Sequence, residues 1–199
     1  MSKLMDFLRP HRSIPKTPWS ATGRWDLSFT RVAILFFGLI IFGFGDALLV
    51  QSHTGNAPWT VLSQGLSIKT GLSIGETTFL ISTIVLFFWW PLGEKPGFGT
   101  LSNILLIALA IQIGVSNFPV ANNFAIGIIY DFLGVALVGI GSSLYITCAL
   151  GPGPRDGLMT SLHNRTGIRV GRIRLLIESC AFLAGWALGG RIGVGTAIF

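Results

Sequence analysis

The chain has 199 residues and a formal net charge of +6; 51% of its residues are apolar and only 11% are charged. A typical soluble domain has roughly 25% charged residues, so this composition excludes an ordinary soluble protein. Most of the Lys and Arg residues flank apolar runs, so we interpret the positive charge as setting orientation in a membrane rather than binding nucleic acid. We expect an all-α integral membrane protein in contact with the lipid bilayer.

Residues 1–29 are predicted to form a basic cytoplasmic tail. They contain five Lys and Arg residues and three prolines, with Trp19 and Trp25 close to the first apolar run. The rival interpretation is a cleaved signal peptide. It is weak because the apolar run is too long and no small-residue cleavage pattern follows it.

Five apolar runs predict five transmembrane helices, which together form a single domain over residues 30–199. The first run has 21 residues, equivalent to about 31 Å of helix, enough to cross the core of a bilayer. The runs are 30–50, 79–90, 101–115, 124–150 and 175–188.

The first half of the chain recurs in the second half at an offset of 96 residues, the separation of Pro58 and Pro154. Residues 54–75 align without a gap with residues 150–171. The aligned residues are mostly glycine and proline, so the repeated property is backbone geometry rather than a reactive side chain. The glycines expected to be structural are Gly55, Gly71, Gly99, Gly151, Gly167 and Gly195.

Each copy contains a short helix that begins at a proline, which is favoured in the first turn of a helix. The segment from Pro58 to Ile68 has 11 residues, about 16 Å of helix, too short to span a bilayer. We therefore expect two interfacial or re-entrant helices, one in repeat 1 (about 30–123) and one in repeat 2 (about 124–199).

The two repeats are expected to be inverted, because three spans per repeat make the second copy enter from the opposite side. With the N-terminus in the cytoplasm, twelve Lys and Arg residues lie inside and only Lys69 and Arg191 lie outside. The sequence stops at Phe199, the counterpart of Asn103, so repeat 2 is expected to lack its third helix.

The candidate substrate site lies where the starts of the two short helices are expected to converge on one cavity. Helix starts favour anions, and Arg155 adds a fixed positive charge. The plain alternative is that Asp156 stabilises the helix start and Arg155 only follows the positive-inside rule. The candidate residues are Pro58, Trp59, Gly153, Pro154, Arg155, Asp156, Glu178 and Asp46.

Several polar residues within apolar segments have both a structural and a functional interpretation. Glu178 follows Arg174 by four residues, which predicts either an ion pair on one helix face or a proton relay. Asp46 and Asp131 are either functional or merely solvated near an interface. Gln112 is expected to join two helices.

No metal site or cofactor is expected. The three histidines lie far apart, and Cys148 and Cys180 are expected to be buried, inert thiols. No nucleophile lies beside a base at a useful spacing, so we expect no enzyme.

The segments LGPGPRDGLMTSL (150–162), RTGIRVGRIR (165–174) and GRIGVGT (190–196) resemble the bacterial YczE-like membrane proteins of the YczE/YitT-type group. The resemblance implies a multi-spanning protein of the bacterial plasma (inner) membrane, and it implies no activity. Two functions stay open: a secondary transporter of a small polar or anionic molecule, or a non-transporting partner. The partner would dock a cytoplasmic enzyme or anionic lipid through its basic loop. The oligomeric state is not predicted.

Overall fold

The computed structural model describes residues 16–199, which form nine helices and no strands. The predicted tail therefore lies partly outside the described residues. The helices are α2 (Phe29–Ser52), α3 (Pro58–Thr70), α4 (Ile74–Phe87), α5 (Trp89–Leu92), α6 (Phe98–Asn117), α7 (Phe124–Thr147), α8 (Pro154–Thr166), α9 (Val170–Ala187) and α10 (Val194–Ile198).

Four segments are long and apolar enough to cross a membrane: α2, residues 74–92 of α4 and α5, α6 and α7. The predicted fifth span corresponds to α9, which has 18 residues but is not among these four. Arg172, Arg174 and Glu178 all lie within α9 and lower its hydropathy. A fifth crossing therefore stays a prediction.

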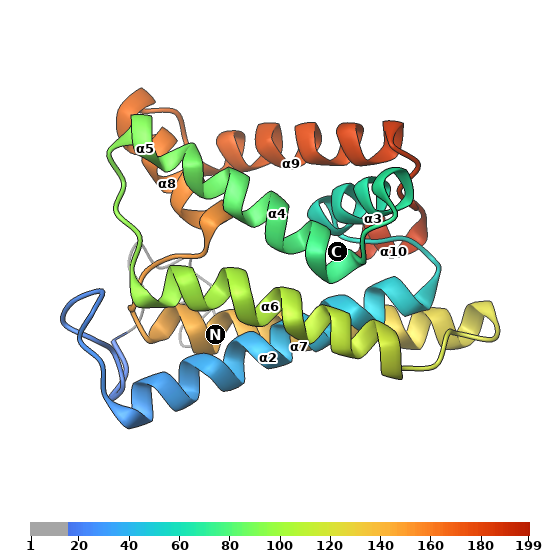
Figure 1. Cartoon of the computed structure of the whole chain (residues 1–199), viewed down its shortest axis with the longest axis horizontal. Helices are drawn as coiled ribbons and strands as arrows, with labels where there is room; N and C mark the ends of the chain where they lie inside the picture. The colour runs from blue at the N-terminus through green and yellow to red at the C-terminus, as the bar shows by residue number, and fades with distance from the viewer. Residues whose placement is uncertain (1–15) are drawn as a thin grey trace, which may run out of the picture.

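The helices are arranged in two layers (Figure 1). One layer contains α2, α6 and α7, and the other contains α3, α4, α8 and α9. The α2–α7 pair is antiparallel, because Gly38 of α2 faces Gly141 of α7 while Gly45 faces Gly134. A Cβ added at Gly45 would lie 2.7 Å from the Gly134 carbonyl oxygen. The two helices therefore touch through backbone, as small residues permit in membrane proteins.

The repeat detected in the sequence is visible in the backbone. Helices α3 and α8 both have 13 residues, and each ends at a glycine in the left-handed region, Gly71 and Gly167. The two glycines that precede the short helices, Gly55 and Gly151, also have positive φ (136° and 114°). L side chains rarely adopt this conformation, so these four positions suit glycine.

Helices of the first repeat pack against helices of the second. Helix α3 of the first repeat packs along α9 of the second, and α8 of the second packs against α4 of the first. The Gly99 amide donates to the Leu150 carbonyl oxygen at 2.8 Å, and the equivalent Gly195 amide donates to Thr54 at 3.2 Å. The amides of Gly99 and Gly195 therefore make equivalent hydrogen bonds to the other repeat.

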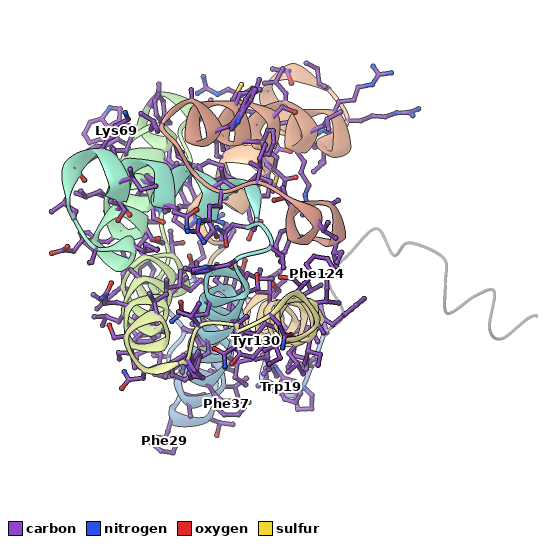
Figure 2. The ribbon with its side chains drawn as sticks, turned by 90° about the vertical axis from the view of Figure 1, so that its right-hand side faces the viewer. Trp19, Phe29, Phe37, Lys69, Phe124 and Tyr130 are labelled. Carbon is purple, nitrogen blue, oxygen red and sulfur yellow. The ribbon has the colours of Figure 1, made fainter. Side chains whose placement is uncertain are left out.

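Large apolar side chains cover much of the outer surface, as a bilayer environment requires. Phe29, Phe37 and Phe124 are 91%, 61% and 65% exposed, and Figure 2 shows the first two pointing away from the helices. Cys148 is buried but Cys180 is exposed on α9, so the expectation of two buried thiols is wrong for Cys180. Only one stripe of α9 is buried, at Ile173, Ala181 and Gly185.

Candidate functional site

A cavity of about 250 Å³ lies between the starts of α3 and α8. Helices α2, α4, α6, α7 and α9, together with Phe199, complete its walls. Seven of the eight candidate substrate residues line it: Pro58, Trp59, Gly153, Pro154, Arg155, Asp156 and Glu178. The two Pro-led helices thus begin at one shared space, although they are 96 residues apart in the sequence.

Both helix starts at the cavity lack a capping side chain. The residues before the two prolines are Ala57 and Gly153, and neither forms a side-chain hydrogen bond to the first turn. Both of these residues line the cavity. Uncapped starts leave first-turn amides available and carry a positive partial charge, so this end of the cavity suits an anionic group.

Arg155 carries the positive charge of this site. Its Cζ atom lies 4.9 Å from the centre of the Trp59 ring, which links α8 to α3 by a cation–π contact. Among residues 16–199, none of the ion pairs and none of the side-chain hydrogen bonds involves Arg155. The guanidinium group is therefore held by an aromatic face, and its donors remain available for a ligand.

The start of α8 is fixed from two sides. The buried Tyr145 of α7 donates its hydroxyl to Asp156 Oδ2. On the other side, Trp89 Nε1 donates to the Pro154 carbonyl oxygen at 3.0 Å, and the Trp89 ring packs so closely on Gly157 that no Cβ would fit there. Asp156 thus binds a neighbouring helix, which the interpretation as a simple helix-start charge did not include.

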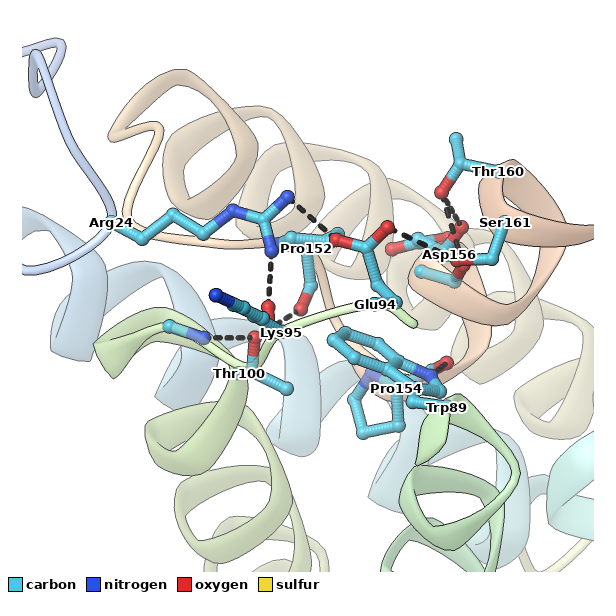
Figure 3. A network of polar contacts seen from close by, with 12 residues as sticks. Arg24, Trp89, Glu94, Lys95, Thr100, Pro152, Pro154, Asp156, Thr160 and Ser161 are labelled. Carbon is cyan, nitrogen blue, oxygen red and sulfur yellow. Dashed lines mark hydrogen bonds and ion pairs between the residues drawn. The ribbon is translucent and has the colours of Figure 1, made fainter. Parts of the chain in front are cut away.

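A polar network joins residues 16–28 and the α5–α6 linker to α8 (Figure 3). Arg24 pairs with Glu94 at 2.6 Å, and Ser161 donates to the other Glu94 oxygen at 3.1 Å. The Thr100 hydroxyl donates to the Pro152 carbonyl oxygen at 2.8 Å. Sequence reasoning missed this network. The only available signal was a lone carboxylate, Glu94, in the linker between two apolar runs.

Glu178 and Arg174 form the ion pair that their spacing predicted, with 2.8 Å between Oε1 and Nε. Both residues line the cavity. Glu178 is therefore already partnered, and its role as a proton carrier stays a hypothesis. Gln112 accepts from the Gly75 amide at 3.2 Å, which confirms that it joins α6 to α4.

Asp46 and Asp131 are 1% and 0% exposed, so the interpretation of both as merely solvated is wrong. Asp46 is not among the residues that line the cavity. One oxygen of each carboxylate is buried without a hydrogen-bond partner in the part of the chain that the structure describes. The packing of α2 against α7 and α6 buries these groups, which no local pattern could reveal.

Comparison with known proteins gives a family and no activity. Residues 29–199 match the model of a family of unknown function, DUF6198. An uncharacterised protein of Haemophilus influenzae is 43% identical over 188 residues, covering 94% of this chain and 86% of that protein. The uncharacterised membrane protein YczE of Bacillus subtilis is 33% identical over 170 residues, covering 84% of this chain and 79% of that protein.

A third relative, the uncharacterised protein YyaS of Bacillus subtilis, is 27% identical over 165 residues, covering 81% of this chain and 82% of that protein. No solved structure matches the chain. The resemblance to the YczE-like proteins is therefore confirmed by similarity along most of the chain. The chain belongs to the membrane-protein family of unknown function DUF6198.

Proposed function

We propose that this protein is a secondary transporter, which binds a small polar or anionic molecule in the cavity between the starts of α3 and α8. The observation that carries the proposal is the position of Arg155. Its guanidinium group lines the cavity over the Trp59 ring, and no ion pair among residues 16–199 involves it. An anionic group of the solute would accept hydrogen bonds from its free donors.

The size of the cavity favours a small solute. Its volume of about 250 Å³ lies just below the ~300 Å³ at which pockets for drug-sized ligands begin. Amides in the first turns of α3 and α8 would bind the same anionic group that Arg155 contacts. The apolar wall formed by Ile107, Val138 and Ile177 would accept a short hydrocarbon part of the solute.

Antiparallel packing supports an inverted repeat. Helices α2 and α7 are equivalent in the two repeats, and the pairing of Gly38 with Gly141 and of Gly45 with Gly134 gives them opposite directions. Inverted repeats with interrupted segments at matching positions bind substrate where the repeats meet, and alternating access arises by rocking one repeat against the other. On this proposal the protein lies in the bacterial inner membrane with its N-terminus in the cytoplasm, as the charge distribution predicts.

Binding of anions to the purified protein tests the site. Inorganic phosphate, sulfate, acetate and short dicarboxylates would be titrated while the midpoint of thermal unfolding, Tm, is recorded in detergent. We expect at least one of these anions to raise the Tm of the wild type and of Arg169→Ala, whose side chain is exposed. Arg155→Ala should lose that shift, because the anion loses the guanidinium group that lies over Trp59.

The second candidate function is a membrane partner that docks a cytoplasmic enzyme or anionic lipid. Four exposed arginines between the end of α8 and the first half of α9 favour it: Arg165, Arg169, Arg172 and Arg174. Neutralising Arg165, Arg169 and Arg172 together would remove this function and leave anion binding at Arg155 intact. The same variant therefore separates the two proposals.

A further inference from the structure

We infer that Asp131 binds a sodium ion in an oxygen-lined niche between the end of α2, the middle of α7 and the first turn of α10. The inference goes beyond the proposed function and stands without it. It rests on the burial of Asp131, on the positions of the oxygen atoms around it, and on the negative charge that no cationic side chain balances.

The Asp131 carboxylate is fully buried and lacks a cationic partner. Its exposure is 0%, and none of the ion pairs among residues 16–199 includes it. Thr54 donates its hydroxyl to Oδ2, while Oδ1 is buried without any hydrogen-bond partner in the described residues. A charged carboxylate buried in this condition is strongly unfavourable unless a bound cation or a proton neutralises it.

Three oxygen atoms from separate parts of the chain converge beside Gly195. A Cβ added at this glycine would lie 2.6 Å from the Gly55 carbonyl oxygen, 2.8 Å from Thr54 Oγ1 and 2.9 Å from Asp131 Oδ1. The Ser52 hydroxyl lies 2.9 Å from Thr54 Oγ1 and adds a fourth oxygen nearby. Carboxylate, carbonyl and hydroxyl oxygens are the ligands that hard cations prefer.

The charge of the niche selects a monovalent cation. One carboxylate contributes a single negative charge, and the carbonyl end of the 24-residue helix α2, which closes at Ser52, adds negative partial charge. A monovalent ion leaves this buried region close to neutral, whereas a divalent ion would leave it positive. Unwound backbone at helix ends coordinates sodium in this way in secondary transporters.

The equivalent position, reached by exchanging the two repeats, lacks this niche. Asp131 aligns with Leu35, which is also 0% exposed, and Gly195 aligns with Gly99. A Cβ at Gly99 would meet the carbonyl oxygens of Gly151 and Leu150 at 3.0 and 3.1 Å, and no carboxylate is among its nearest atoms. The loop that supplies Thr54 and Gly55 continues into Ala57 and Pro58 at the cavity, so an ion held here would order the start of α3.

The test is the dependence of the Tm of the purified protein on NaCl, against choline chloride at the same ionic strength. We expect sodium to raise the Tm of the wild type by roughly 3–6 °C when its concentration is about tenfold above the dissociation constant. Asp131→Asn should remove this sodium-specific shift. Asp46→Asn is the matched control, because Asp46 is equally buried and also has an unpartnered oxygen; it should keep the shift.

If Asp131→Asn fails to fold, Thr54→Val replaces it; this variant removes one oxygen ligand and should weaken the sodium response at least severalfold. A wild type whose Tm is the same in NaCl and choline chloride overturns the inference. A sodium shift that survives in Asp131→Asn or Thr54→Val also overturns it, as does a dependence on pH with none on sodium. None of these outcomes affects anion binding at Arg155, so this site and the proposed transport fail separately.

Discussion

The Arg155 guanidinium lies over the ring of Trp59, with 4.9 Å between Cζ and the ring centre. Arg155 is the second residue of α8 and Trp59 the second residue of α3, so the contact joins the same position of the two repeats. Equivalent positions of the two repeats therefore carry different side chains, a cation in the second repeat and an aromatic ring in the first.

The Arg155–Trp59 contact is expected to show an energetic coupling. In a double-mutant cycle of Arg155→Met and Trp59→Leu, the free energies of unfolding should reveal an interaction of about 0.5–2 kcal/mol. Trp59→Phe keeps an aromatic ring and should retain part of the interaction energy. A coupling of zero within error would show that the two side chains are only neighbours.

Close contact between α2 and α7 should make Gly134 intolerant of any side chain. A Cβ at Gly134 would lie 2.8 Å from the Gly45 carbonyl oxygen, whereas a Cβ at Gly139 on the same helix meets nothing within 4 Å. We expect Gly134→Ala to destabilise the protein by roughly 1–3 kcal/mol through overpacking. Gly139→Ala should be neutral or stabilise it by up to about 1 kcal/mol, because alanine is the better helix former.

Thermal unfolding of both variants in one detergent checks this prediction. Equal stabilities would mean that α2 and α7 do not touch at Gly134. A loss of stability in Gly139→Ala alone would mean that the Gly139 face of α7, rather than the Gly134 face, packs against α2.

The Arg24–Glu94–Ser161 network is expected to hold residues 16–28 against α8. Glu94→Gln removes the ion pair and keeps a hydrogen-bond acceptor for Ser161. The side chains are 41% and 18% exposed, so the ion pair should contribute no more than about 1 kcal/mol. Hydrogen–deuterium exchange should increase in residues 16–28 and at the start of α8, and high salt should reproduce part of the increase in the wild type.

A matched control for Glu94→Gln is Asp26→Asn. This variant removes the Arg31–Asp26 pair at 2.7 Å and should affect residues 22–31 without changing exchange in α8. The network does not fix α8 if both variants increase hydrogen–deuterium exchange in α8 equally. The same conclusion holds if Glu94→Gln leaves exchange unchanged in both α8 and residues 16–28.

The proposed inverted topology predicts that Asn122 lies outside and Asn164 in the cytoplasm. Single cysteines at these positions, in a protein without Cys148 and Cys180, should react with an impermeant maleimide from opposite sides of the membrane. Asn122 lies in the α6–α7 loop and Asn164 near the end of α8, and Asn164 is exposed. Labelling of both from the same side would contradict the inversion.

The parts of the fold predictable from sequence are those in which a local rule determines the backbone. Pro58 and Pro154 start helices because proline fits the first turn, and Gly71 and Gly167 end them in a conformation that glycine favours. The meeting of the two helix starts was also predicted, because matching segments of an inverted repeat are expected to come together from opposite sides.

Other parts depend on contacts between distant segments and carry no local signal. Arg24 and Glu94 are 70 residues apart, and neither has a motif around it. The burial of Asp46 and Asp131 follows from glycine-mediated packing of α2, which hydropathy does not report. Helix α9 shows the opposite difficulty: an apolar run predicts a span, while three charged residues within it keep it outside the four clear candidates.

Passage of a small polar or anionic solute through the cavity beside Arg155 is measured most directly as uptake into proteoliposomes that contain the purified protein. The solutes to be tested are radiolabelled phosphate, sulfate and short carboxylates. We expect uptake of at least one solute, reduced at least tenfold in Arg155→Ala and unchanged in Arg169→Ala. Transport through this cavity is ruled out if no solute of the panel enters faster than into protein-free liposomes, or if uptake is the same in Arg155→Ala as in the wild type.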